Sequence, residues 1–435
     1  MPDIRDYCDR LWRGEIDTIH EAHPVTSTWN NREPEEIEDG FLYIKSAASM
    51  NTIDTGDGLV MLDTGTARDA EGLFNGVRAW RPETPLRAAV FSHHHVDHIF
   101  GVNRFDDEAA EQGQARPVVY GQRHIPAHFD RYKRTVGYNT AINSRQFIRP
   151  GMDAEQVRLP WPDEFRYPDV TFDNAIRFSV GELTFEVTHT RGETEDAAWT
   201  WVPEKKWLFP GDLFIWAVPN AGNPQKAQRW AGEWAAGLRQ MAGKGAEMMS
   251  PGHGFPIFGA DRVAEALNDT ADLLDEIENQ TLALMNLGYT LDNVLHSIEM
   301  PQHLLDKPWL RSAYDHPEFI VHSVWRYFGG WYEGEPDRLL PAPRSAEAAE
   351  WVTLAGGLAP VMDRARAHME NGNLQMACHL IEGAALAAPN STDVHALRTE
   401  IYEARAAEQD SSMARGVFTF AASSSQHGKR DMFNP

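Results

Sequence analysis

The first part of the chain, from about residue 41 to residue 256, alternates short apolar runs with polar turns. Between several of these runs, over 67–80 and 225–242, apolar residues recur at helical spacing. Alternating strands and helices in one segment indicate an α/β or sandwiched-sheet domain. The runs rich in β-branched and aromatic residues, which predict strands, cover 41–45, 59–62, 88–91, 118–120, 183–187 and 199–202.

After Gly259 the pattern changes to amphipathic helices, predicted over 261–287, over 314–328 and in two or three segments from 346 to 408. Residues 361–388 and 392–407 resemble one helical-hairpin repeat, which is too short for a solenoid. A second, all-helical domain is therefore expected. The predicted organisation is a first domain over 1–259, a helical domain over 260–410 and a tail over 411–435. The tail is rich in Ser and Ala and is expected to be poorly ordered, apart from 417–420, which could dock.

Length and charge limit the possible organisation and functions of the chain. Its 435 residues are more than one hydrophobic core usually organises, so two or more domains are expected. A formal net charge of -24 disfavours nucleic acids and anionic membrane surfaces as partners. No run approaches the ~20 apolar residues of a membrane-spanning helix. The polar N-terminus lacks the apolar core of a secretory signal, so we expect a cytoplasmic protein. Cys8 and Cys378 are too few for a thiolate cluster, so any metal ion must use nitrogen and oxygen ligands.

The strongest chemical signal is the run His-His-His-Val-Asp-His over 93–98, at the end of an apolar strand. Imidazole and carboxylate are the ligands that zinc takes when thiolate is absent. His93 and His95 alternate out of the strand end and can aim at one point, while Asp97 and His98 turn toward a second point. Two-metal hydrolases place their ions roughly 3.5–4 Å apart. The run therefore predicts a metal site that needs further ligands from elsewhere in the chain.

This HxHxDH pattern resembles the metallo-β-lactamase superfamily, in which Gly-His-Thr, Gly-Asp and Gly-His follow in that order. Here the matching segments are Gly-Glu-Thr at 192–194, Gly-Asp at 211–212 and Gly-His at 252–253. The resemblance covers the first domain and implies an αββα sandwich with two zinc ions per chain. It places His93, His95 and Glu193 on one ion, puts Asp97, His98 and His253 on the other, and makes Asp212 the bridge. Asp97 and Asp212 are the expected catalytic residues.

Glu193 stands where the superfamily usually has histidine, a replacement associated with alkylsulfatases. Glu195 and His189 stay open as alternative ligands. Asp63, in the Leu-Asp-Thr-Gly segment over 62–65, matches a further superfamily turn. We expect it to orient ligands through hydrogen bonds, because a metal-bound imidazole needs a fixed partner on its other nitrogen.

The helical region resembles the dimerisation domain of alkylsulfatases, through segments at 287–290, 327–336 and 371–377. This resemblance implies a homodimer formed through the helical domain. Two departures stand out. Such sulfatases commonly carry a further C-terminal lipid-carrier-like domain, which is not expected here. They also place a histidine after the bridging carboxylate, whereas 213–229 contains none, so the acid that protonates the leaving group stays unassigned.

The leading interpretation is a binuclear zinc hydrolase that cleaves a small-molecule substrate, an organic (alkyl) sulfate ester, to alcohol and sulfate with a metal-bound hydroxide. Iron and manganese accept the same ligands, and fold does not determine substrate, so a phosphoester, lactone or β-lactam is an alternative. A second alternative is a non-catalytic, metal-stabilised dimeric binding protein. Trp161, Phe214 and Trp216 could line an alkyl pocket. Amide and guanidinium donors suit tetrahedral anions, and the candidates of this kind, with one tyrosine, are Tyr138, Asn139, Arg145, Asn220, Asn223 and Arg229.

Overall fold

A computed structural model describes residues 3–25 and 34–433 of the chain. By their internal contacts these residues form two compact units. The sheet unit comprises Met1–Arg134 and Pro162–Trp331, and the helical unit comprises Thr135–Trp161 and Tyr332–Pro435. Each unit is described by itself.

The sheet unit contains two β-sheets. One has the order β1-β2-β3-β4-β5-β6-β7 and the other the order β13-β12-β11-β10-β9-β8. Strands β4 to β7 pair in parallel, as do β11 and β12, and the other neighbours are antiparallel. The strands are β1 (Glu35–Glu38), β2 (Phe41–Lys45), β3 (Ser49–Asp54), β4 (Leu59–Leu62), β5 (Leu86–Val90), β6 (Val118–Gln122), β7 (Val170–Phe172), β8 (Ala175–Val180), β9 (Leu183–His189), β10 (Ala198–Val202), β11 (Trp207–Phe209), β12 (Met248–Met249) and β13 (Ile257–Phe258).

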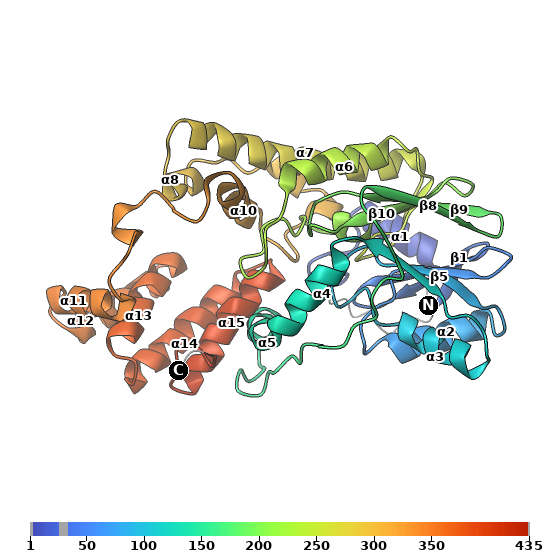
Figure 1. Cartoon of the computed structure of the whole chain (residues 1–435). Helices are drawn as coiled ribbons and strands as arrows, with labels where there is room; N and C mark the ends of the chain where they lie inside the picture. Colours follow the sequence, from blue (N-terminus) through green and yellow to red (C-terminus); the bar gives the residue numbers. More distant parts are fainter. Residues whose placement is uncertain (1–2, 26–33, 434–435) are drawn as a thin grey trace. The chain divides into compact units, whose positions relative to one another are not determined.

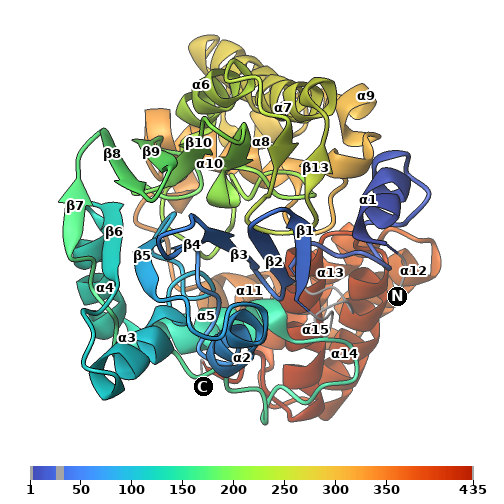
Figure 2. The same cartoon turned by 90° about the vertical axis from the view of Figure 1, so that its right-hand side faces the viewer.

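The helices of the sheet unit cover the outer faces of the two sheets. Figure 2 shows α6 and α7 outside one sheet and α2 and α3 outside the other. These helices and their neighbours are α1 (Ile4–Trp12), α2 (Ala70–Trp80), α3 (Val102–Glu111), α4 (Ile125–Arg134), α6 (Ala231–Ala242), α7 (Ala260–Asn286), α8 (Leu291–Leu295), α9 (Gln302–Leu305) and α10 (Pro317–Gly329).

Strand β2 explains why the layers form, because its alternate residues face two different cores. Phe41 and Tyr43 pack in the core between the sheets, whereas Leu42 and Ile44 pack with residues of α2 and α3. Burying one such side chain contributes about 1.5–3 kcal/mol. With both faces of the sheet apolar, the strand needs a layer on each side. The predicted αββα sandwich is therefore confirmed.

The helical unit packs small residues closely. Ala365, Ala377 and Ala384 are fully buried beside Ile381 and Ile401. Figure 1 shows α14 and α15 side by side within this unit, in agreement with their contacts. Its helices are α5 (Val136–Phe147), α11 (Arg344–Leu354), α12 (Leu358–Glu370), α13 (Leu374–Ala387), α14 (Thr392–Ala407) and α15 (Ser412–Gln426).

Two predictions about organisation need correction. The boundary expected between 259 and 260 does not separate the compact units, since α7 to α10 belong to the sheet unit and 135–161 to the helical unit. The expectation of a poorly ordered tail over 411–435 was wrong, because most of it forms α15. Ser411 caps this helix, Phe420 is buried, and a Cβ at Gly416 would overlap the carbonyl oxygen of Gln146. The small residues of the tail thus allow close helix contact.

Among the described residues, no helix is both long and apolar enough to cross a bilayer.

Candidate metal centre

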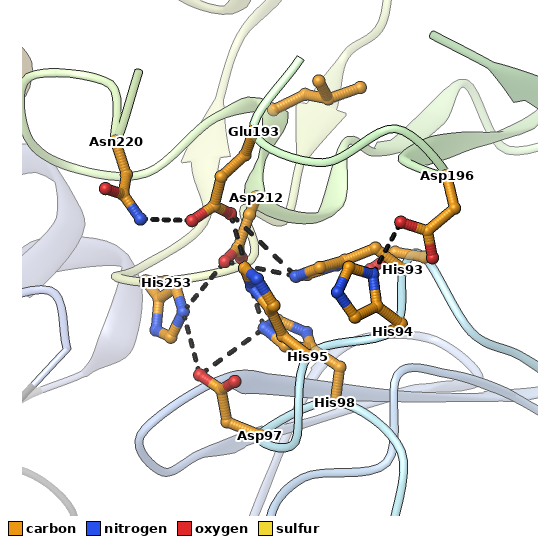
Figure 3. Close-up of polar contacts among 12 residues, drawn as sticks. His93, His94, His95, Asp97, His98, Glu193, Asp196, Asp212, Asn220 and His253 are labelled. Carbon is orange, nitrogen blue, oxygen red and sulfur yellow. Dashed lines mark hydrogen bonds and ion pairs between the residues drawn. The ribbon is translucent and has the colours of Figure 1, made fainter. Parts of the chain in front are cut away.

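The seven residues predicted as metal ligands meet between the ends of strands from both sheets (Figure 3). The run over 93–98 follows β5, and Glu193 lies in the loop between β9 and β10. Asp212 lies in the 3-10 turn Gly211–Leu213 after β11, and His253 follows β12. A Cβ at Gly252 would overlap Asp212 Oδ1, so the residue before His253 must be small. Segments more than a hundred residues apart thus form one cluster.

The ligand atoms form two groups that share one carboxylate. His93, His95, Glu193 and Asp212 form the first group, and Asp97, His98 and His253 form the second. Asp212 Oδ2 lies 3.6 Å from His93 Nε2 in the first group and 3.3 Å from His253 Nε2 in the second. Its Oδ1 lies 3.3 Å from His98 Nε2. The Asp212 carboxylate therefore stands between the groups, where a bridging ligand would stand.

The imidazoles that present Nε2 to the centre are held by their other ring nitrogen. His98 Nδ1 is 2.8 Å from Asp63 Oδ2, His93 Nδ1 is 2.9 Å from Ser92 Oγ, and His253 Nδ1 is 2.6 Å from Ala47 O. Asp63 also accepts from Ser92 N at 2.8 Å. The predicted orienting contact of Asp63 is confirmed, and such contacts fix ring orientation and tautomer.

The donor set fits a cation. His93 Nε2, His98 Nε2, Glu193 Oε2 and Asp212 Oδ1 are buried and have no hydrogen-bond partner among the described residues. Buried polar atoms normally have a partner, because leaving one unmet costs about 1–3 kcal/mol. Four such atoms facing one centre, on nitrogen and carboxylate oxygen alone, match the ligands that zinc accepts.

Without a cation, burial and the neighbouring charged groups shift the pKa values of the residues at the centre. Burial, together with the neighbouring His98, lowers the pKa of His93 to about 4. Burial and the nearby Asp212 raise the pKa of Glu193 well above its usual range. Burial lowers the pKa of His253, but Asp212 and Asp97 together outweigh it and raise that pKa to about 10. Neutral His93 offers the lone pair that metal binding requires.

Two of the predicted substrate contacts, Asn220 and Arg229, contact Glu193. Asn220 Nδ2 donates to Glu193 Oε1, as Figure 3 shows, and Arg229 Nη1 donates to the Glu193 carbonyl oxygen. Arg229 Nη2 lies 3.6 Å from Glu193 Oε1, and both side chains are buried. A buried carboxylate needs such donors. Asn220 and Arg229 therefore support the carboxylate that replaces the usual histidine.

The other four predicted substrate contacts are described by their own surroundings. Asn223 is buried, and its Oδ1 accepts from Gln225 N at 3.0 Å. Tyr138, Asn139 and Arg145 belong to α5 of the helical unit. Arg145 pairs with Asp431 at 2.9 Å, and Asn139 donates to Thr135 O at 3.0 Å. As substrate contacts these three residues stay predictions.

The alternative ligands and the aromatic candidates have other partners. His189 Nε2 bonds to the carbonyl oxygen of Glu195 at 2.7 Å, and Glu195 Oε2 lies 3.6 Å from His128 Nε2. Neither residue belongs to the two groups at the centre. Phe214 and Trp216 are 1% exposed and pack in the core between the sheets, so they do not line a pocket.

A buried network beside the centre was not predicted from the sequence. His94 Nδ1 lies 2.7 Å from Asp196 Oδ1, and Arg131 Nη2 lies 3.2 Å from His94 Nε2. The ring of His94 stacks on that of His128 with centroids 4.2 Å apart. An arginine on one nitrogen and a stacked ring leave poor geometry for a third ion. The hydrogen bond between His94 and Asp196 instead ties the histidine loop to the loop that carries Glu193.

Lys226 adds a cation that sequence reasoning also missed. It lies in the segment after Asp212 that contains no histidine. Burial lowers the pKa of Lys226 to about 7, while Asp97 and Glu193 act to raise it. No motif surrounds this lysine in the sequence, so only the fold reveals its nearness to the centre.

Comparisons with known proteins show which families the chain resembles. Residues 48–253 match the model of the Metallo-beta-lactamase superfamily, and residues 290–428 match the model described as Alkyl sulfatase dimerisation. A linear primary-alkylsulfatase from a Pseudomonas species is 27% identical, over 75% of this chain and 64% of its own length. An (R)-specific secondary-alkylsulfatase from Pseudomonas sp. is 26% identical, over 88% of this chain and 60% of its own length. The chain thus spans less than two thirds of these relatives.

A solved structure extends the likeness to the fold. The stereoselective inverting sec-alkylsulfatase Pisa1 from Pseudomonas sp. superposes with a TM-score of 0.81 at 25% identity. The match covers 91% of this chain and 66% of that one. Both family models and the superposition therefore extend over the sheet unit and the helical unit. The chain therefore resembles alkylsulfatases over both units, with a segment that matches the metallo-β-lactamase superfamily followed by one that matches the alkylsulfatase dimerisation model.

Proposed function

We propose that the protein is a binuclear zinc hydrolase that cleaves an organic sulfate ester to an alcohol and sulfate. The observation that carries the proposal is the Asp212 carboxylate, which stands between two groups of ligand atoms at 3.3–3.6 Å. The curated relatives named above are alkylsulfatases, which supports sulfate esters as the substrate class.

The residues at the centre would hold two ions. His93, His95 and Glu193 would bind one, Asp97, His98 and His253 the other, and Asp212 both. When bound, a zinc pair supplies a hydroxide at neutral pH and neutralises charge on the sulfate. A closed structural site surrounds its metal ion with protein ligands. Hydrolysis instead requires a metal ion with fewer protein ligands, so that one position stays open for water.

The chain's own groups prepare this chemistry. Asn220 and Arg229 hold the Glu193 carboxylate in a fixed orientation, so that one oxygen faces His93 and His95 at 3.9 and 3.8 Å. Asp63 fixes the ring of His98. Because these groups are arranged before substrate binds, little reorganisation is needed during the reaction.

The test is sulfate release from a panel of primary and secondary alkyl sulfates by zinc-loaded protein, with metal content measured on the same samples. We expect turnover and about two zinc ions per chain. His93→Ala should lose both turnover and metal, whereas His303→Ala, an exposed histidine of the same unit, should keep both. Turnover of phosphoesters, lactones or β-lactams without any sulfate release would contradict the proposed substrate class.

We further propose that the protein forms a homodimer through its helical domain. The match of residues 290–428 to the alkylsulfatase dimerisation model supports this assembly. Exposed apolar side chains are frequent in this region, including Leu340 at 93% and Trp331 at 73%. Exposed apolar patches of this kind mark interaction surfaces.

A further inference from the structure

The helical unit contains a large cavity that the proposed reaction does not use. It has a volume of about 670 Å³ and lies among α11, α13, α14 and α15. Its walls are mainly aliphatic and aromatic, with Trp351, Val352 and Leu386 among them. Sites for small molecules are typically apolar hollows of about 300–1,000 Å³ with a few polar groups.

A second cavity of about 320 Å³ adjoins the first, and charged side chains make up a larger share of its lining. The two cavities share Arg344 and Phe418 among their lining residues, so they adjoin at these side chains, and together they make up the hollow. Four arginines line the second cavity, against two carboxylates: Arg145, Arg344, Arg398 and Arg430 face Glu382 and Asp431. In a chain of net charge -24, this local excess of positive charge stands out.

Two of the four arginines have their charge compensated and two do not. Arg398 pairs with Glu382 at 2.5 Å, and Arg145 pairs with Asp431 at 2.9 Å. Within residues 3–25 and 34–433, Arg344 and Arg430 form no ion pair. Guanidinium groups bind carboxylate, sulfate and phosphate oxygens through parallel hydrogen bonds. An anionic head group in the second cavity could therefore pair with these two arginines.

We propose that this hollow binds a single-chain amphiphilic anion, with its alkyl tail in the larger cavity and its head group at Arg344 and Arg430. The ligand class is an alkyl chain that ends in a sulfate, sulfonate or carboxylate. Burial of each methylene contributes about 0.8 kcal/mol, which is about fourfold in affinity, so longer chains bind more tightly. The residues of this site belong to the helical unit and those of the metal centre to the sheet unit, and the proposed binding does not depend on hydrolysis.

Cys378 provides a local reporter, because it lines the larger cavity and is a half-buried free thiol. The other cysteine, Cys8, is 4% exposed in the sheet unit and reports on global unfolding. The test measures the rate at which a maleimide labels Cys378 in the full chain, by mass spectrometry. Decanesulfonate and decanoate should each slow labelling at least tenfold. Methanesulfonate, which lacks the tail, and decyltrimethylammonium, which reverses the charge, should not.

Variants locate the effect within the hollow. Gly383 lines the larger cavity from the middle of α13, and a Cβ there meets no atom within 4 Å. Gly383→Leu should fill the cavity and abolish protection, and Arg344→Gln combined with Arg430→Gln should weaken it. Gly72→Leu is the matched control, at an exposed glycine of α2 that also faces open space. Arg68→Gln is the charge control.

Three results would overturn the proposal: protection that persists in Gly383→Leu, equal protection by the decyl cation, or no protection by either decyl anion. A Cys378 that reacts only after dilution would show that a second copy of the chain covers the hollow, which also overturns it. Equilibrium dialysis with decanesulfonate provides an independent count. Gly383→Leu should bind one molecule per chain fewer than the unchanged protein, and equal counts would contradict the site.

Discussion

Glu193 and Glu195 are two residues apart in one acidic turn, yet their side chains have different surroundings. Glu193 is 3% exposed and faces His93, whereas Glu195 approaches His128 at the edge of the cluster. The resemblance at 192–194 favours Glu193 in the sequence, but Glu195 stays open there as an alternative ligand. The choice depends on which one Asn220 and Arg229 can reach.

This pair provides a matched test of the ligand set. Glu193→Gln should lower zinc content from two ions per chain toward one and reduce sulfate release on the order of 100-fold or more, since losing even an indirect support of a ligand costs 10–100-fold. Glu195→Gln removes the same charge two residues away and should leave both values within twofold. Metal analysis and turnover of the two purified variants show whether Glu193 or Glu195 is the ligand. Equal losses in both would show that local charge, and not ligation, is what matters.

Lys45 is a buried cation that no function in the structure explains. It is 2% exposed, and its ammonium donates to the carbonyl oxygen of Ser46. Burial lowers the pKa of Lys45 from 10.5 to about 7, although Asp69 acts in the opposite direction. Below pH 7 the folded and unfolded states both carry the proton, so the cost of burying the charge is complete and constant. Between pH 7 and 10.5 the unfolded state binds more protons, and the free energy of unfolding therefore rises with pH.

Lys45→Met should accordingly be more stable than the unchanged protein by roughly 1–3 kcal/mol near pH 6.5, after loss of the hydrogen bond to Ser46 is taken into account. The advantage should shrink steadily as the pH approaches 10. Urea unfolding at several pH values measures the difference. Lys205→Met, at an exposed lysine, should show no such trend. A constant difference across the pH range would contradict the burial argument.

At the scale of elements, the ends of β4 and β5 determine the geometry of the histidine loop. Asp63 lies just after β4 with φ 57°, in the left-handed region, and its carboxylate bonds to Ser92 and His98 beyond β5. One side chain therefore links two strand ends to a metal ligand. The strand pairing places them side by side, since Leu62 pairs with Val90.

Asp63→Asn should lower zinc affinity about 10–100-fold without unfolding the protein. Asparagine tolerates the left-handed conformation and keeps one acceptor oxygen, but it cannot stabilise the His98 ring by charge. Competition with a chromophoric chelator measures the affinity. Asp57→Asn, in the exposed turn before β4, is the control and should bind zinc normally. Unchanged affinity in Asp63→Asn would show that backbone contacts alone hold the loop.

Elements with a strong apolar pattern were predicted well. The strands over 41–45 and 59–62 match β2 and β4 residue for residue, and the helix expected over 261–287 is α7 to within one residue. Strand β3 was missed because its Ser49, Asn51 and Thr52 are polar although they are buried in the sheet. Helix α15 was missed because its apolar surface is made of small residues, whose packing depends on partners that the sequence does not reveal.

The same division holds at the site. The motifs named all seven residues of the cluster, because ligand type and spacing are local properties of the chain. Asp196, Arg131 and Lys226 carry no such local signal. Their roles beside the centre follow from long-range packing, and so do the contacts of Asn220 and Arg229 with Glu193.

At the scale of the whole molecule, the boundary between the two units is determined by topology more than by the change in composition along the chain. The transition to helices after residue 259 is real in the sequence, but α7 covers the outer face of a sheet and so completes the sandwich. An amphipathic helix shows that one face is buried and does not show against what. The unit boundary therefore follows packing partners that are remote in sequence.

The loop between α10 and α11 carries the last prediction. Leu339 is 50% exposed and Leu340 is 93% exposed, and both lie within the segment that matches the dimerisation model. Leu340 also has φ 55°, a conformation that a leucine adopts only at a cost. A strained, exposed leucine is best explained by a partner surface that receives it. Sedimentation of the full chain, of 49.0 kDa, should therefore give the mass of a dimer.

Leu340→Asn should weaken that dimer at least tenfold while leaving the fold intact, because asparagine accepts the left-handed conformation more readily than leucine. Met152→Lys is the matched control, since Met152 is 48% exposed in the same unit but lies outside the matched segment. It should sediment as the unchanged protein does. Each chain holds all seven ligand residues of its own centre, so the Leu340→Asn monomer should keep its zinc. A chain that is monomeric at every concentration, or a Leu340→Asn dimer of undiminished strength, would contradict the assignment of this loop to the interface.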